Sequence, residues 1–359
     1  MLLAIAMVAR AFDFSHTAST GQRLYYAFVD NASVKVVAPA NGASWEGYEM
    51  PVGRLTIPTM VEFEGTQYVV AAIDKNAFSN CEGLTAVVVP SSVVSIGLRA
   101  FAHCTSLASV TLEEGVQSIA TLAFLACTSL DTIVLPSTLT SIGTFAFNDT
   151  GYINNSDNWS SALTLSIGSW LIQAANTVSG EVVVEDGMLG IADNAFYSCR
   201  YLRGITLPAT LQHIGGSAFQ QCSVLDTVHV MAEEPPTLGE DVFYGASNVV
   251  VQVPCGALTA YSAAARWNTV PLVEAKCPEP QDSTGIGDVE RMNGISVVVE
   301  NGQPVVLHAD GRILQVFDVM GRCIETVHRA SGRQPIVLPQ RGIYILRCDG
   351  ESLKFSYSK

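Results

Sequence analysis

The stretch SIGLRAFAHCTSLASVTL, residues 95–112, determines the fold, because its spacing of apolar residues recurs along the chain. Six apolar positions define the pattern: Ile96, Phe101, Cys104, Leu107, Val110 and Leu112. The same six positions are filled again in copies that start at Ile73, Ile119, Ile191 and Ile214. Neighbouring copies follow one another as 23-residue units, and the match at all six positions in every copy indicates an internal repeat.

The repeat is interrupted once. A copy begins at Ile142 and Phe147 and then breaks, and the pattern resumes only at Ile191, which leaves room for one repeat unit and an insertion. The insertion, near 151–190, contains the polar stretch GYINNSDNWSS, which predicts a loop. It also contains SWLIQAANTVSGEVVVEDG, which predicts a β-hairpin. A shortened last copy, LGEDVFYGASNVVVQVP, ends the series.

A 23-residue unit is too short to bury an apolar face by itself, whereas stacked units share one continuous core, so the repeat predicts a solenoid over 73–253. The segments SVTL and TIVL alternate and are rich in Val, Ile and Thr, which indicates short strands that pair with the next coil about 4.8 Å away. The segment AFAHC predicts a tight turn with Phe101 and Cys104 pointing inward. The predicted fold class is therefore mainly β, a repeat solenoid.

The neighbours His103 and Cys104 have the residue types of a nucleophile with its base, but only the Cys is periodic. The preceding residue varies from copy to copy, which indicates an exposed position. We interpret the repeated cysteines as free, buried thiols that act as small apolar side chains: Cys81, Cys104, Cys127, Cys199 and Cys222. The chain contains no C-x-x-C and no H-E-x-x-H, and the sequence predicts no metal site, no cofactor and no catalytic residues.

The residues that carry this pattern resemble the BspA-like leucine-rich repeat of bacterial surface proteins. The resemblance implies capping segments at both ends, here an N-terminal β cap at 12–72 and a C-terminal cap at 254–273 with a short helix at about Ala257 to Arg266. Caps are also expected physically, because an open solenoid end would expose core side chains and an unpaired strand edge.

The composition changes after the repeats. Residues 274–291 are acidic and rich in Pro, Gly and Ser, which predicts a linker. About seven short alternating runs follow in 292–359 and predict a small antiparallel β-sandwich. This region resembles a type IX secretion sorting domain, although one more residue than usual separates Pro339 from Gly342. The matching residues are Gly321, Arg322, Leu338, Pro339, Gly342, Tyr344, Lys354 and Lys359. The resemblance implies contact with the secretion machinery.

Composition and the N-terminus indicate export. The chain has 359 residues and a formal net charge of −14, which argues against nucleic acid and anionic membrane surfaces as partners. Leu2–Val8 is a short apolar run before Ala9-Arg10-Ala11, which predicts a signal peptide over 1–11, complete or truncated at its start. No later run is long enough to span a membrane. For a secreted chain, bridges Cys255–Cys277 and Cys323–Cys348 are among the connectivities that the sequence leaves open.

The outward strand positions supply the candidate binding residues. If the repeated apolar residues point inward, the residues between them line one face of the solenoid, and that row is small, neutral and rich in hydroxyl groups. The same composition also fits an exposed sheet that binds nothing. The candidates are Ser109, Thr111, Thr132, Val134, Thr206, Thr227 and His229.

The resemblance implies a non-catalytic adhesion protein, a monomer that is secreted or held on the outer membrane of a bacterium. Its expected partner is an extracellular protein of a host matrix or cell surface, or of other bacteria. One alternative is a structural spacer or matrix component. Another is a carbohydrate-binding protein, in which Tyr152, Trp159 and Trp170 of the insertion stack on sugar rings, although such aromatics also serve as core or loop anchors.

Overall fold

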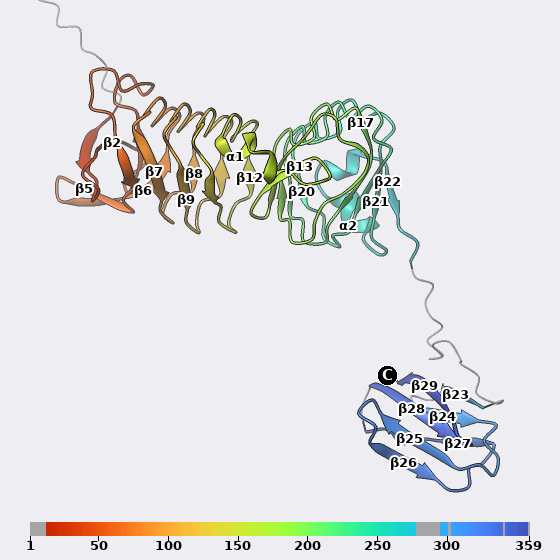
Figure 1. Ribbon diagram of the computed structural model, residues 1–359. Helices are drawn as coiled ribbons and strands as arrows, with labels where there is room; N and C mark the ends of the chain where they lie inside the picture. Colours follow the sequence, from red (N-terminus) through yellow and green to blue (C-terminus); the bar gives the residue numbers. More distant parts are fainter. Residues whose placement is uncertain (1–11, 278–294, 301–302, 340–341, 358–359) are drawn as a thin grey trace, which may run out of the picture. The chain divides into compact units, whose positions relative to one another are not determined.

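A computed structural model describes residues 12–277, 295–300, 303–339 and 342–357. The chain forms two compact units, Met1–Ala275 and Lys276–Lys359 (Figure 1). The expected signal peptide at 1–11 lies outside the described residues, and so does most of the expected linker at 274–291.

The first unit begins with a small group of strands that joins the repeats through a shared sheet. These strands are β1 (Phe14–Thr17), β2 (Arg23–Phe28), β3 (Ser33–Val37), β5 (Met60–Phe63) and β6 (Thr66–Ile73). The first three form an antiparallel meander, β5 and β6 form a hairpin, and β3 pairs in parallel with β6. Because β6 also pairs in parallel with the first short repeat strand, Ile73 opposite Ile96, the N-terminal strands continue directly into the solenoid.

Each coil of the repeat contributes one short and one longer strand, and each strand pairs in parallel with the strand of the same kind in the next coil. The short strands are β8 (Ser95–Ile96), β10 (Ser118–Ile119) and β12 (Ser141–Ile142). The longer ones are β4 (Gly53–Thr56), β7 (Leu84–Val89), β9 (Ser109–Leu112) and β11 (Thr132–Val134). Val110 faces Val87 on one side and Ile133 on the other, each one repeat unit away, which confirms the predicted solenoid and its repeat length.

The sheet of longer strands ends after β11 for a reason visible in the sequence. In the next coil Ile153 takes the place of Leu130, but Asn155–Asn158 stands where a strand would follow. This polar stretch forms the 3-10 helix η1 (Ser156–Asn158) instead, with Asn155 as its N-cap, directly after helix α1 (Gly151–Asn154). The Asn155 side chain accepts a hydrogen bond from the Asp157 backbone N–H, a local bond that competes with strand pairing.

A second stack of coils follows, again with two sheets. One contains β13 (Thr164–Ile167), β14 (Trp170–Ala174), β16 (Gly190–Ile191), β18 (His213–Ile214) and β20 (Thr237–Leu238). The other contains β15 (Ser179–Val183), β17 (Tyr201–Leu207), β19 (Thr227–Val230), β21 (Val250–Val253) and β22 (Leu272–Glu274). In Figure 1 the coils before the insertion are seen from the side and the later ones nearly along their axis, so the axis turns there.

The prediction of a β-hairpin within SWLIQAANTVSGEVVVEDG is wrong, because the two strands of this segment do not pair with each other. β14 pairs antiparallel with β13, which precedes it, and in parallel with β16. β15 instead pairs in parallel with β17 and starts the second sheet of longer strands. The later half of the insertion is therefore a degenerate coil of the solenoid, which the spacing of one repeat unit between Val182 and its partner Ile205 also indicates.

Phenylalanine rings stack along the interior of both groups of coils. In the first stack the rings of Phe78, Phe101, Phe124 and Phe147 follow one another with centroids 4.9, 5.2 and 5.2 Å apart and planes within 10°. In the second, Phe219 lies between Phe196 at 5.0 Å and Phe243 at 5.6 Å. This ladder of rings, together with Ile, Val and Leu of the strands, forms the core.

A second ladder consists of the repeated cysteines. All five are free and buried, which confirms the prediction, and burial raises the pKa of the Cys81 thiol well above its usual range. The thiol also donates a hydrogen bond to the coil before it. Cys104 Sγ lies 3.1 Å from the carbonyl oxygen of Phe78, and Cys127 and Phe101 repeat this contact at the same distance.

Each turn between the sheets contains two residues with left-handed backbone. The first occupies the position of Arg99 (φ 52°) and Leu122 (φ 58°), two positions before the buried Phe. The second is the residue before the Cys, such as His103 (φ 60°) and Ala126 (φ 55°). The residue that we expected to be merely variable is therefore conformationally constrained, and Cys104 is buried while its neighbour His103 is exposed.

Buried aromatic residues with an N–H or O–H cover both ends of the first unit. At the N-terminal end the Trp45 ring stacks on Phe78, and its Nε1 donates to the Ala77 carbonyl oxygen over 2.8 Å. At the other end α2 (Leu258–Ala263) and η2 (Trp267–Thr269) supply Tyr261 and Trp267, which donate to backbone carbonyls over 2.8 and 2.7 Å. The predicted helix is present and shorter than expected.

The second unit contains seven described strands in two antiparallel sheets. The first sheet contains β23 (Ser296–Glu300), β24 (Gln303–Leu307) and β27 (Arg333–Pro335). The second contains β25 (Leu314–Asp318), β26 (Cys323–Val327), β28 (Gly342–Cys348) and β29 (Glu351–Tyr357). Val306 of the first sheet and Leu346 of the second belong to one buried cluster, as expected of a small sandwich.

The cysteines outside the repeats divide into one bonded pair and two free thiols. Cys255 and Cys277 are disulfide-bonded, and the other seven cysteines of the chain are free. The bridge Cys323–Cys348 is therefore wrong. The two residues lie on β26 and β28, which flank β25 on opposite sides, and their partners on β25 are three residues apart. Their Cα atoms are therefore farther apart than two strand spacings of about 10 Å, which is too far for a disulfide.

Candidate functional site

The first candidate surface, here called the first face, consists of the outward side chains of β4, β7, β9 and β11. Pairing aligns them in two rows. One row is Arg54, Ala86, Ser109 and Thr132, and the other is Thr56, Val88, Thr111 and Val134. Exposure rises toward the edge, because Ser109 and Thr111 are partly covered while Thr132 and Val134 are open, the latter 48% exposed. Arg54, at the opposite edge, is the one charged residue of these eight.

The second face consists of the outward side chains of β15, β17, β19 and β21. It aligns Thr206 with His229 and Val183, and Thr227 with Gly204 and Val250. His229 Nδ1 and Gln252 Oε1 share a hydrogen bond of 2.7 Å, which fixes the imidazole along the sheet. Val183, at the free edge, is 69% exposed.

The structure brings the seven predicted residues together in two groups instead of one. Ser109, Thr111, Thr132 and Val134 share the first face, and Thr206, Thr227 and His229 share the second. The two groups belong to different sheets, because the insertion ends one and starts the other. The prediction missed Val183 and Glu181 on the second face, although each stands one repeat unit before its partner on β17.

The insertion aromatics serve mainly as anchors. Trp170 is only 1% exposed, and its ring lies parallel to that of His213 with centroids 6.0 Å apart. Tyr152 OH donates to the Ser166 carbonyl oxygen over 3.0 Å, and Trp159 Nε1 donates to that of Ile153 over 2.9 Å. Both rings are partly buried against the first core. The arrangement therefore favours the anchoring interpretation over a platform of three sugar-stacking rings.

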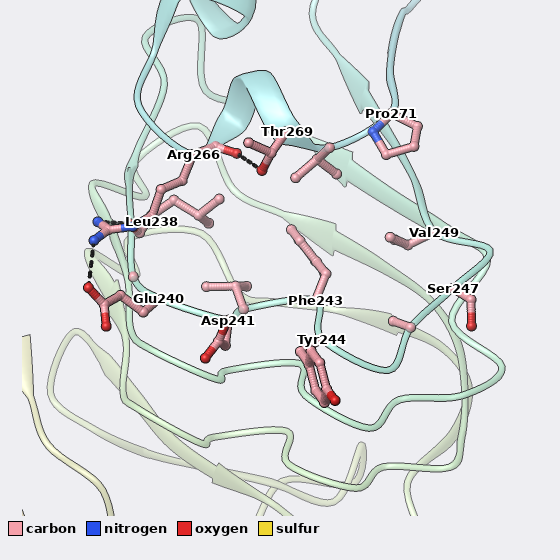
Figure 2. A pocket seen from close by; sticks show the side chains of 14 residues that line it. Leu238, Glu240, Asp241, Phe243, Tyr244, Ser247, Val249, Arg266, Thr269 and Pro271 are labelled. Atoms are coloured by element: carbon pink, nitrogen blue, oxygen red, sulfur yellow. Dashed lines mark hydrogen bonds and ion pairs between the residues drawn. The ribbon is translucent and has the colours of Figure 1, made fainter.

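A pocket lies at the C-terminal end of the solenoid, and we call it the end pocket (Figure 2). Its volume is about 520 Å³, within the range of small-molecule sites. Ten residues within 238–249 of the last coil and four within 266–271 of the cap line it. Figure 2 shows Phe243 projecting into the middle of this space, with Arg266 reaching across to Glu240 at its rim.

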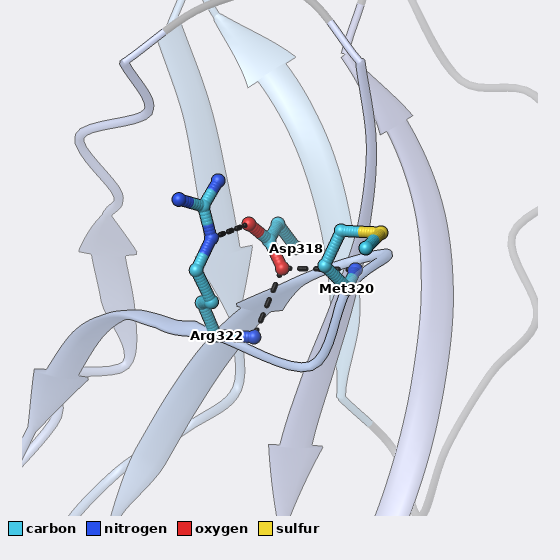
Figure 3. A network of polar contacts seen from close by, with 3 residues as sticks. All are labelled: Asp318, Met320 and Arg322. Atoms are coloured by element: carbon cyan, nitrogen blue, oxygen red, sulfur yellow. Dashed lines mark hydrogen bonds and ion pairs between the residues drawn. The ribbon is translucent and has the colours of Figure 1, made fainter.

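In the second unit, the hairpin between β25 and β26 contains residues of the sorting-domain resemblance (Figure 3). Asp318 Oδ1 accepts hydrogen bonds of 2.9 Å from the backbone N–H groups of Met320 and Arg322, and its Oδ2 pairs with Arg322 Nε at 2.7 Å. These bonds hold the pKa of Asp318 below its usual range, and the hydrogen bond from the Arg322 backbone N–H contributes most. Gly321 has a φ of 80°, so the turn requires its freedom.

Two general features of the described residues bear on the site. Within them, no group of three or more His, Cys, Asp or Glu side chains is arranged to hold a metal ion. The same residues include no helix of the length and apolar character that crossing a membrane requires.

Several solved structures share features with this chain. The leucine-rich repeat protein TpLRR of T. pallidum is 24% identical, with 63% of this chain and 87% of that chain covered and a TM-score of 0.34. A leucine-rich repeat protein from Bacteroides capillosus is 28% identical over 37% of this chain and 91% of that chain, with a TM-score of 0.32. A leucine rich cell surface protein from Faecalibacterium prausnitzii is 17% identical over 74% and 96%, with a TM-score of 0.26.

These TM-scores are low, and the three likenesses carry no argument about function. No curated protein matches the chain significantly. The decisive comparison is with a family model, the BspA type leucine rich repeat region, which matches residues 62–178 and 175–282 in six copies. The match spans more than half of the chain and coincides with the coils described above, so this protein belongs to the BspA-type leucine-rich repeat family.

Proposed function

We propose that this protein is a non-catalytic binding protein displayed outside a bacterial cell, and that the first face holds an extracellular protein partner. The observation that carries the proposal is the composition of that face. The protein has a net charge of −14, yet seven of the eight outward residues of the first face are uncharged. The eight residues form two straight rows across four parallel strands. An open uncharged area of this kind suits contact with a second polypeptide.

The side chains also suit close approach. Ala86, Ser109 and Thr111 are short, so the backbone of a partner can lie near the sheet, and the hydroxyl groups can both donate and accept hydrogen bonds. Val134 adds exposed apolar area at the edge of the face. A non-catalytic role agrees with the separation of His103 from Cys104, because one side chain is exposed and the other lies in the core.

The test is binding of the full chain to a panel of purified extracellular matrix and cell-surface proteins. Thr132→Glu puts a buried charge into the proposed contact and should abolish binding. Ser129→Glu adds the same charge at an exposed turn residue of the same coil and should leave binding unchanged. Binding that survives Thr132→Glu would contradict the proposal, and a lack of binding to the whole panel would favour the spacer.

We further propose that the second unit acts as a sorting domain for type IX secretion. The support is the resemblance in sequence together with the turn at Gly321 and Arg322, which Asp318 stabilises through three contacts. Deleting residues 292–359 should leave the protein in the periplasm, as measured by protease accessibility of intact cells. Normal surface delivery of the shortened chain would show that the second unit is not the sorting signal.

A further inference from the structure

The two ends of the phenylalanine ladders differ. At the N-terminal end, Trp45 covers the outer face of Phe78 with centroids 6.2 Å apart and planes 23° apart. At the C-terminal end, Phe243 stacks on Phe219 through one face, with planes 7° apart. No residue of the coil that contains Phe219 lines the end pocket, so the pocket lies on the other side of the Phe243 ring.

The end pocket therefore occupies the place of one further ring. Arg266 stands one repeat unit after Phe243, where another coil would supply a Phe, and its side chain turns away to the rim instead. Trp267, the next residue, is fully buried and bonded to Pro236, so it closes a different part of the core. Phe243 remains only partly buried, whereas Phe196 and Phe219 are fully buried.

The floor and the rim of the pocket differ in chemistry. Apolar side chains form the floor: Leu238, Val242, Phe243, Ala246, Val249 and Val270. At the rim, Arg266 Nη2 lies 3.0 Å from Glu240 Oε1, and Arg266 Nη1 donates to the Leu238 carbonyl oxygen. This pairing neutralises Glu240 and leaves the exposed Asp241 carboxylate as net negative charge beside an apolar pocket.

We propose that the end pocket receives one aromatic side chain of a partner polypeptide, which stacks on Phe243 as the next ring of the ladder. The neighbours of that aromatic residue in the partner are Lys or Arg, which pair with Asp241. The pocket is larger than one ring, so the flanking backbone also fits, within reach of the hydroxyl groups of Ser247 and Thr269. This site is separate from the first face and does not depend on the function proposed for it.

Fluorescence anisotropy with labelled pentapeptides and the full chain tests the proposal. The probe GKFKG should bind more tightly than GKLKG by about two- to tenfold, the contribution of one aromatic pair. It should also bind more tightly than GEFEG, and added salt should reduce that difference. N-acetylphenylalanine amide should compete only weakly; if it binds as well as GKFKG, the site takes free aromatic compounds and the proposed polypeptide partner is wrong.

Three variants locate the binding. Val270→Phe fills the pocket from the cap and should abolish binding, whereas Val183→Phe adds the same side chain on the second face and should not change it. Phe243→Leu keeps the pocket apolar and should reduce the preference for GKFKG over GKLKG. Asp241→Asn should weaken binding of GKFKG and GKLKG, which carry the lysines, but not binding of GEFEG. Circular dichroism checks that each variant is folded. If Val270→Phe does not fold, the comparison of wild type with Phe243→Leu tests the proposal. Equal binding by wild type and Phe243→Leu, or no binding by wild type, would overturn the proposal.

Discussion

The coils before and after the insertion obey one repeat rule but end in different ways. The first stack has four ladder rings, closed at the N-terminal side by Trp45, and its longer strands end at the polar turn of Asn155–Asn158. The second stack has three rings, and its last coil is held by the cap and by the disulfide between Cys255 and Cys277. Ending a solenoid thus requires residues that depart from the repeat.

The junction between the stacks shows that the two sides of a coil can behave independently. Both sheets of the first stack stop at the insertion, the longer strands at β11 and the short strands at β12, but hydrogen bonds still join the stacks on the side of the short strands. The Asp193 backbone N–H donates to the Ile142 carbonyl oxygen over 2.9 Å, and Thr144 Oγ1 donates to Asn194 Oδ1 over 2.8 Å. A few hydrogen bonds on one side join the stacks, and the break in both sheets allows the axis to turn.

The largest expected effect distinguishes a ring inside the ladder from a ring at its end. Phe124→Ala removes a fully buried ring between two others and should lower the free energy of unfolding by about 3–5 kcal/mol. Phe243→Ala should cost less, because that ring is partly exposed and stacked on one face only. Urea unfolding followed by tryptophan fluorescence measures both, and equal losses would contradict the distinction.

Removing the disulfide should affect the second stack alone. The bridge between Cys255 and Cys277 closes a short loop, and this lowers the entropy of the unfolded chain enough to stabilise the fold by about 3 kcal/mol. The double substitution of both residues by Ser should therefore accelerate amide hydrogen exchange in residues 190–275. Exchange in residues 73–147 should not change, and a matching increase there would mean that the stacks unfold together.

The cysteine ladder should contribute less per residue than the rings. Cys104→Ala leaves the Phe78 carbonyl without the thiol donor and should cost about 1–2 kcal/mol. Cys104→Ser keeps a donor and should cost less than the Ala variant, and Cys222, which makes the same 3.1 Å contact with Phe196, should give the same order in the second stack. Thermal denaturation measures all four variants. A Ser variant less stable than the Ala variant would show that the hydrogen bond contributes little.

The smallest expected effect concerns the left-handed position before the cysteine. Ala126 (φ 55°) lacks the freedom of glycine, so Ala126→Gly should stabilise the protein by about 0.5 kcal/mol. The equivalent residue of the last coil, Gly245 (φ 84°), already has this freedom. Gly245→Ala should destabilise, since the added Cβ would also lie 2.7 Å from Gln221 Nε2. Melting temperatures measure both changes, and shifts of the same sign would contradict this reasoning.

The sequence predicts the core well, because the regular period assigns each Phe, Cys and Leu of the repeat to the interior. The sequence also marks the left-handed turn positions. Asn and Asp tolerate left-handed backbone, and their presence at Asn76, Asn80 and Asp149 marks both turn positions. The split into two faces depends on residues 155–158, which prefer a local turn to a strand. The repeat period does not predict this preference. The end pocket depends on which way Arg266 turns, and that follows from tertiary contacts alone.

The burial of the repeated thiols has a practical consequence for labelling. A thiol reacts through its thiolate, and burial blocks the approach of a reagent to all five repeated thiols and also raises the pKa of Cys81. Cys348 is also buried, so Cys323, on the second unit, is the one exposed free thiol among the described cysteines. A maleimide dye should therefore attach at a single position without any substitution, and it would report on the second unit while the solenoid remains unmodified.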